Sequence, residues 1–155
     1  MVEKELLSLI LQDFPESVIF TIVCFVLLNL KLEWKKILII SILQSLTNLV
    51  RLLPIAFGVH TVILTISLVF YIRIMTNSQL SKIFMATITC MVVLIASQII
   101  YLKPMMKLFN LDLQGVNSSP FYRALFSIPE YIALLLIPAV KKIYTHNRLK
   151  MQLPK

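Results

Sequence analysis

Apolar residues lie in five long stretches of this chain, and polar residues collect in the segments between them. The stretches run over residues 14–30, 37–53, 59–75, 83–102 and 121–140, so each contains 17 to 20 residues. An α-helix of that length can cross a hydrocarbon core of about 30 Å with little tilt. The pattern predicts an all-α fold, a polytopic membrane protein built as a bundle of about five transmembrane helices.

The helical domain is predicted to cover residues 1–145, and residues 141–155 are predicted to form a basic cytoplasmic tail. The apolar segment Leu6–Leu11 is either an interfacial turn or an extension of the first helix. The segments that join the helices are short except for residues 103–120, which contain Pro104 and Gly115. Both residue types disfavour a continuing helix, so a long loop is expected there.

The composition agrees with a lipid environment. Of the 155 residues 59% are hydrophobic and only 14% are charged, whereas a soluble domain of this size needs more polar surface to cover its core. The chain has only 2 glycines, too few for the repeated tight turns of a β-barrel. Helices therefore remain as the way to satisfy the backbone in hydrocarbon, and the lipid bilayer is the expected partner.

The formal net charge of +8 is better explained by membrane topology than by nucleic-acid binding, because the basic residues lie between and after the apolar stretches. Ten of the basic residues fall on one side of the predicted bundle and five on the other. This asymmetry predicts a multi-pass protein of the cell membrane with its N-terminus outside and its C-terminus in the cytoplasm. The ten are Lys31, Lys35, Lys36, Arg73, Lys82, Lys141, Lys142, Arg148, Lys150 and Lys155.

Familiar catalytic patterns are missing from the sequence, and enzyme activity is not expected. No phosphate-binding loop, dinucleotide fingerprint, HExxH or GxSxG occurs. Cys24 and Cys90 each lie inside an apolar stretch with no histidine placed to activate them, so we interpret them as buried, inert thiols. His60 and His146 are expected on opposite sides of the membrane. No metal and no cofactor are therefore predicted.

Several polar residues inside the apolar stretches are expected at one depth. Counted at 1.5 Å per residue from the basic border, Glu16 and Arg51 lie at about 22 Å, His60 at about 20 Å and Glu130 at about 16 Å. Asn48 and Gln98 come to roughly the same level by the same count. Because ionisable groups in a membrane usually have a partner or a function, these residues form one candidate cluster. The set is Glu16, Asn48, Arg51, His60, Gln98 and Glu130.

Three interpretations of this cluster stay open at the level of sequence. Arg51 can simply pair with a glutamate and hold the helices together. A second possibility is that the residues line an outward-facing pocket that receives a signal. The third is that Arg51 and Glu16 each extend to the membrane–water interface and do not contact each other. Glu16 and Glu130 each follow a proline directly, which places each of them in the first turn of a helix or beside a kink.

The stretch TNLVRLLPIAFGVHTVIL, residues 47–64, together with FPES at residues 14–17, resembles the N-terminal membrane region of Firmicutes sensor histidine kinases, distantly those of the quorum-sensing AgrC type. The resemblance covers residues 1 to about 145. It implies that the bundle receives a signal and passes it down the last helix. It also implies that Arg51, Pro54, Gly58 and His60 belong to the receiving region.

The sequence departs from that family because no phosphoacceptor helix and no ATP-binding segment follow residue 145, so kinase activity is not carried over. We expect an isolated sensor domain, a truncated relative, or a regulator that works through a partner. The candidate partners are a cytoplasmic kinase or regulator and a second copy of the chain, with no nucleic acid. The alternative hypothesis is a small membrane transporter or permease subunit, in which the polar cluster binds the substrate or a proton.

Overall fold

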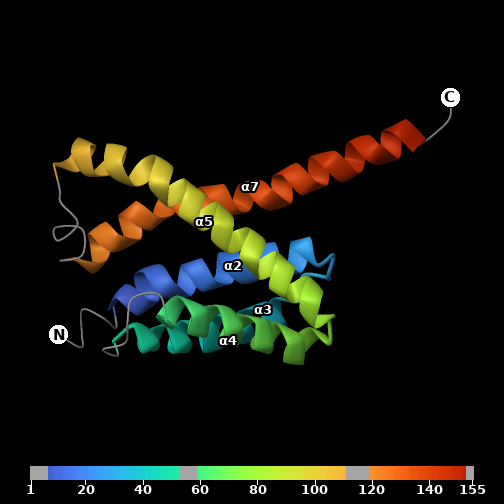
Figure 1. The fold of residues 1–155 in the computed structure, drawn as a ribbon, viewed down its shortest axis with the longest axis horizontal. Coiled ribbons are helices and arrows are strands. Elements are labelled where there is room, and N and C mark those ends of the chain that lie inside the picture. The colour runs from blue at the N-terminus through green and yellow to red at the C-terminus, as the bar shows by residue number, and fades with distance from the viewer. Residues whose placement is uncertain (1–6, 53–58, 111–118, 153–155) are drawn as a thin grey trace.

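The computed structural model describes residues 7–52, 59–110 and 119–152, and for residues 51–52 and 144–152 it describes the backbone alone. Every element in these ranges is helical, which confirms the predicted all-α fold (Figure 1). A π-helical turn and a 3-10 turn accompany five long helices. In chain order the elements are η1 (Leu9–Asp13), α2 (Phe14–Leu27), α3 (Trp34–Thr47), η2 (Asn48–Leu52), α4 (Val59–Thr76), α5 (Leu80–Phe109) and α7 (Pro120–Gln152).

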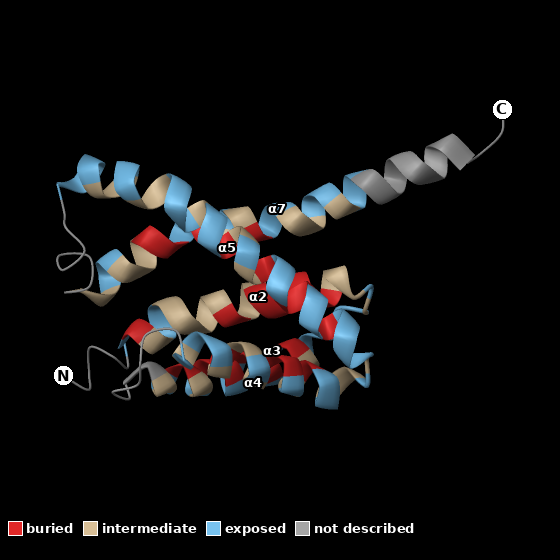
Figure 2. Cartoon of the chain, viewed as in Figure 1, coloured by how far each residue is buried: buried red, intermediate tan, exposed pale blue. Residues whose placement is uncertain are grey.

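Helix α2 lies at the centre of the bundle and packs against α3, α5 and α7, while α4 packs against α3 and α5. The core forms where these helices meet, around Phe25, Ile40, Ile72 and Leu134. Cys24 of α2 and Cys90 of α5 are both buried there, with their sulfurs 4.0 Å apart. Figure 2 shows the buried residues on the faces that the helices turn toward one another.

The outer surface of the bundle is also largely apolar, which favours contact with lipid over contact with water. Ile66, Phe70, Ile99 and Ile100 are all more than half exposed. Four helices in the described ranges are long and apolar enough to cross a membrane: Leu9–Leu27, Val59–Thr76, Leu80–Phe109 and Pro120–Ile143. Helix α3 has 14 residues, and η2 prolongs it by 5 to a helical rod of about 31 Å. The fold is thus a helical membrane bundle.

Asparagine ends three of the helices in place of glycine. Asn29, Asn77 and Asn110 follow α2, α4 and α5 with φ values of 56°, 51° and 50°, in the left-handed region that asparagine tolerates better than most residues. After α2 the amide of Leu30 donates to the carbonyl of Phe25 at 2.9 Å, and that of Asn29 donates to Val26 at 3.1 Å. This pair of bonds is the Schellman arrangement, and it stops α2 before the next connection.

The first helix takes the longer of the two forms that the sequence pattern left open. The residues before Phe14 extend the first helix, since η1 continues directly into α2. The amide of Phe14 donates to the carbonyl of Leu9. That wider turn carries the helix past Pro15, whose ring would clash with a carbonyl four residues earlier in a regular α-helix.

The predicted loop over residues 103–120 is wrong in its first part, because α5 continues through Pro104 to Phe109. The ring of Phe109 lies 5.8 Å from that of Phe126, centroid to centroid. Packing of this last turn against α7 helps to offset the backbone hydrogen bond that Pro104 removes. Helix α7 likewise continues through Pro129 and Pro138 to Gln152, so the backbone of the predicted tail is helical in that range.

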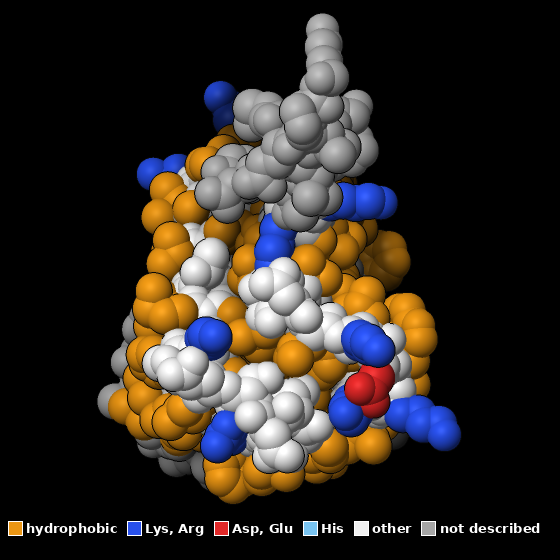
Figure 3. Space-filling view, turned by 90° about the vertical axis from the view of Figure 1, so that its right-hand side faces the viewer, with side chains coloured by type: hydrophobic (Ala, Val, Ile, Leu, Met, Phe, Trp, Pro, Cys, Tyr) orange, Lys and Arg blue, Asp and Glu red, His pale blue; other side chains and the backbone are white. Residues whose placement is uncertain are grey.

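Basic side chains gather at one end of the bundle, where α2 and α4 end and α3 and α5 begin. We call this the basic end and define it by Lys31, Lys35, Lys36, Arg73, Lys82, Lys141 and Lys142. Figure 3 looks onto it and shows lysine and arginine side chains around a polar surface. Glu33 lies among them and pairs with Lys36 at 3.0 Å.

Lys141 fastens α7 to α2 at the basic end. Its ammonium group donates to the carbonyls of Val26 at 2.6 Å and Leu27 at 3.0 Å, and to Oδ1 of Asn29 at 2.8 Å. The last carbonyls of a helix have no partner within the helix and carry the negative end of its dipole. A lysine from another helix therefore satisfies them and ties the two elements together.

Candidate functional site

A cavity of about 460 Å³ lies between α2, α3, α4 and α5. Its lining residues come from the start of α2, the end of α3, the start of α4 and the middle of α5, so it lies toward the end opposite the basic end. One part of the lining is apolar and the other is polar. The lining consists of Glu16, Ser17, Phe20, Gln44, Asn48, Thr61, Leu64, Leu68, Met91, Leu94, Ile95 and Gln98.

The polar side chains that line the cavity differ in how many of their hydrogen-bonding groups are already engaged by other residues. Nε2 of Gln44 donates to the carbonyl of Leu64 at 3.0 Å, and its Oε1 accepts from the hydroxyl of Ser67 at 3.2 Å. Gln44 therefore mainly joins α3 to α4. Asn48, only 7% exposed, is the residue that follows α3 directly. A buried amide keeps several donor and acceptor positions that a molecule in the cavity can meet.

Glu130 adjoins the cavity from α7. It is 7% exposed, and its Oε1 accepts a hydrogen bond from Nε2 of Gln98 at 2.8 Å and another from the hydroxyl of Tyr101. Both donors come from α5. Donors to a carboxylate lower the free-energy cost of keeping that group away from water. Gln98 thus belongs to the cavity lining and at the same time holds α7.

Two tyrosines complete the polar region around the cavity. Glu16 and Glu130 both interact electrostatically with the hydroxyls of Tyr101 and Tyr131. The hydroxyl of Tyr131 also donates to the backbone carbonyl of Gln12 at 3.0 Å, which joins α7 to the first helix. The two carboxylates are therefore parts of one electrostatic environment that includes α2, α5 and α7.

The structure brings together four of the six residues of the predicted cluster. Glu16, Asn48 and Gln98 line the cavity, and Glu130 is hydrogen-bonded to Gln98. His60 is half-buried on α4, next to the lining residue Thr61. The side chain of Arg51 lies outside the described residues. A role for this cluster in binding stays a prediction.

The two proline-glutamate steps differ in their helical context. Glu16 lies in the first turn of α2, directly after the π-helical turn. Glu130 instead lies in the interior of α7, after a proline inside that helix. Because η1 continues directly into α2, neither glutamate lies at the free N-terminus of a helix, and the positive end of a helix dipole favours neither carboxylate. Glu130 depends on its hydrogen-bond donors.

Sequence reasoning missed the tyrosines and Lys141. Tyr101 follows Gln98 by three residues, a spacing that puts both side chains on one face of a helix, and this signal was available. Lys141 had no such signal, because its partners are backbone carbonyls of a helix far away in the sequence. A count of basic residues uses Lys141 only to predict which side of the membrane this end of the helix faces.

Among the described residues, no three side chains of His, Cys, Asp or Glu stand close enough together to hold a metal ion. Comparison with family models, with curated proteins and with solved structures finds no match for this chain. The function is therefore argued from the cavity and its neighbours.

Proposed function

We propose that this chain is a non-enzymatic membrane sensor module, in which the cavity binds a small amphipathic molecule and α7 passes the change to a cytoplasmic partner. The volume of about 460 Å³ falls within the range of about 300–1,000 Å³ for small-molecule sites. Phe20, Leu64 and Leu68 provide apolar contacts in the cavity. Glu16, Asn48 and Gln98 provide polar contacts. Such a lining suits a ligand with one polar group on an apolar body.

The observation that carries the proposal is the double role of Gln98. The same side chain lines the cavity and donates to Glu130 of α7. A ligand that competes for the amide of Gln98 changes the hydrogen bonding of Glu130, and a differential contact of this kind is what shifts a conformational equilibrium. Communication between the cavity and α7 then needs only this one side chain of α5.

Helix α7 suits an output element because it is one continuous helix from the level of the cavity to beyond the basic end. It runs from Pro120 to Gln152, and Figure 1 shows its last turns standing clear of the other helices. The proposed orientation puts the basic end in the cytoplasm, following the excess of lysine and arginine there. A cytoplasmic kinase or regulator is the proposed recipient, in keeping with the resemblance to sensor histidine kinases.

A chimera tests this function. We expect a cytoplasmic autokinase module, joined in helical phase after Gln152, to be phosphorylated at a rate that depends on the cavity. Glu16→Ala and Gln98→Leu are each expected to change that rate about tenfold, within the usual range of coupling between sites. Ile66→Ala is the control, because Ile66 is 59% exposed on the outward face of α4. Membrane insertion is checked in parallel by fractionation.

Unchanged phosphorylation in both cavity variants, with normal insertion, contradicts the sensor proposal. The same purified chain in sealed vesicles then distinguishes the alternative. Flux of a solute or of protons that Glu130→Gln abolishes would support a small transporter, in which an intramembrane carboxyl group carries the charge.

A further inference from the structure

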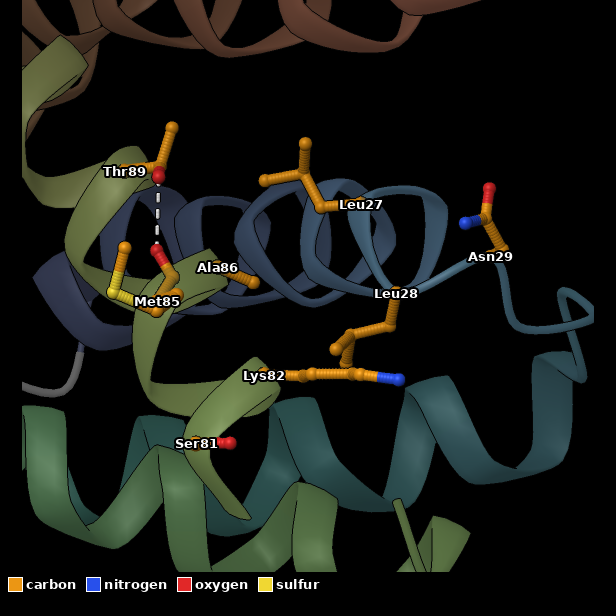
Figure 4. A pocket seen from close by; sticks show the side chains of 8 residues that line it. All are labelled: Leu27, Leu28, Asn29, Ser81, Lys82, Met85, Ala86 and Thr89. Atoms are coloured by element: carbon orange, nitrogen blue, oxygen red, sulfur yellow. Dashed lines mark hydrogen bonds between the residues drawn. The ribbon is translucent and has the colours of Figure 1, made fainter. Parts of the chain in front are cut away.

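A second groove lies at the basic end, between the end of α2 and the start of α5, and no part of the proposed sensor function uses it. Its volume is about 450 Å³, and its lining consists of Leu27, Leu28, Asn29, Ser81, Lys82, Met85, Ala86 and Thr89. Figure 4 shows these side chains from close by. The α5 residues recur at spacings of three and four, so they form one face of that helix and the groove follows its axis.

The chemistry of the groove changes along this axis. Lys82, Ser81 and Asn29 stand at the end nearer the basic surface. Farther from that end the walls are Leu27, Met85 and Ala86. The hydroxyl of Thr89 donates to the carbonyl of Met85 at 2.8 Å, so its polar atom is satisfied locally.

The cationic end of the groove is available to a ligand. The ammonium group of Lys82 makes no hydrogen bond or ion pair with another residue of the described ranges. Oδ1 of Asn29 accepts a hydrogen bond from Lys141 at 2.8 Å, so the Asn29 amide nitrogen is the part of this side chain that can donate to a ligand. An ammonium group and an amide donor both bind phosphate oxygens.

We infer that this groove binds one anionic phospholipid, with the headgroup phosphate at Lys82 and Asn29 and the first part of an acyl chain along Leu27, Met85 and Ala86. A lipid in a bilayer has the same order of chemistry along the same axis, with its charge at the interface and its chain toward the centre. A free phosphate ion matches only the outer half of the groove. Anionic lipids at a cytoplasmic leaflet are attracted by basic residues in this position.

Native mass spectrometry of the purified full chain in detergent tests the inference. Dioleoyl phosphatidylglycerol is expected to remain bound, and dioleoyl phosphatidylcholine, which has no net charge, to bind clearly more weakly. Lys82→Gln is expected to weaken phosphatidylglycerol binding about fivefold, the usual effect of one lysine at an anionic surface. Lys35→Gln is the matched control, because Lys35 is exposed at the same end and lines neither groove nor cavity.

A second pair of variants tests the apolar half. Thr89→Trp fills the inner end of the groove and is expected to weaken lipid binding, whereas Val92→Trp, on an exposed position outside the lining, is expected to leave it unchanged. Equal losses in Lys82→Gln and Lys35→Gln would overturn the inference, since the basic end would then act only as a diffuse charge. Displacement of the lipid by an equal concentration of inorganic phosphate, with no effect of Thr89→Trp, would overturn it in favour of an ion site.

Discussion

Removing both hydrogen-bond donors of Glu130, in the double variant Gln98→Leu and Tyr101→Phe, is expected to lower the free energy of unfolding by about 3 kcal/mol. Glu130 is 7% exposed, and its carboxyl group accepts both bonds on one oxygen. Hydrogen bonds between helices in membranes average only about 0.6 kcal/mol, but bonds to a charged group reach about 1.5–3 kcal/mol, and the acceptor left behind keeps its desolvation cost. The free-energy cost of leaving the carboxylate without donors is therefore expected to exceed the free energy gained from two additional apolar side chains.

Reversible unfolding in mixed micelles of increasing dodecyl sulfate content, followed by circular dichroism, measures this effect. A third change provides the control: adding Glu130→Leu to the double variant is expected to restore most of the stability, because an apolar group of similar size leaves no polar atom without a partner. A triple variant that is as unstable as the double variant would show that packing at these positions, and not the carboxylate, accounts for the loss.

Lys141→Met is expected to destabilise the bundle by about 2 kcal/mol, since the ammonium group makes two hydrogen bonds to the last carbonyls of α2 and a third to the side chain of Asn29, which follows that helix. Methionine keeps the length and apolar stem of lysine and removes only the donors. The expected consequence is local as well as global. Backbone amides in the last turns of α7 near Lys141 are expected to exchange hydrogen faster, because the tie to α2 is lost.

Lys142→Met is the matched control for Lys141. It removes the same charge from the next residue, whose side chain is exposed. A stability loss below about 0.5 kcal/mol is expected for this surface change. If the two variants lose the same amount in the same unfolding measurement, the effect of Lys141 comes from net charge at the basic end and not from capping α2.

The sequence pattern predicted the fold class well because hydrophobicity and length alone decide whether a helix can cross a membrane. It misjudged helix ends. Pro104 predicts the end of a helix, yet α5 passes through it. In a bundle, neighbouring helices can offset a lost backbone bond, and the contact between Phe109 and Phe126 is a tertiary effect that no local pattern contains.

The grouping of Glu16, Asn48, Gln98 and Glu130 followed from a simple count of depth. Consecutive membrane helices run antiparallel, so distance from a common border converts sequence position into height. Height says nothing about which way a side chain points around its helix. Only the structure therefore shows that Gln98 contacts Glu130 directly. It also shows that Glu130 is not one of the described residues that line the cavity.

The links of α7 to its neighbours explain why the proposed signal would travel along it. Near the cavity it is held through Glu130 and through Tyr131, and at the basic end it is held by Lys141. Because these attachments lie at different levels of one helix, the contacts near the cavity can change while Lys141 acts as a pivot. A helix with two such arrangements, biased by a ligand at one end, is the kind of element that converts binding into output.

The distance between α3 and α7 at the basic end tests the central claim most directly. Spin labels at Lys35 and Lys142, both exposed, are measured by pulsed electron paramagnetic resonance in lipid nanodiscs, with Cys24 and Cys90 replaced by alanine. Leu64→Phe enlarges a buried side chain of the cavity wall on α4 and imitates an occupant, and Ile66→Phe adds the same ring on the outward face.

We expect Leu64→Phe to shift the distance distribution between the two labels, Ile66→Phe to leave it unchanged, and Gln98→Leu to abolish the shift when combined with Leu64→Phe. Identical distributions in all of these variants, with the fold intact by circular dichroism, would contradict the claim that the cavity controls the position of α7.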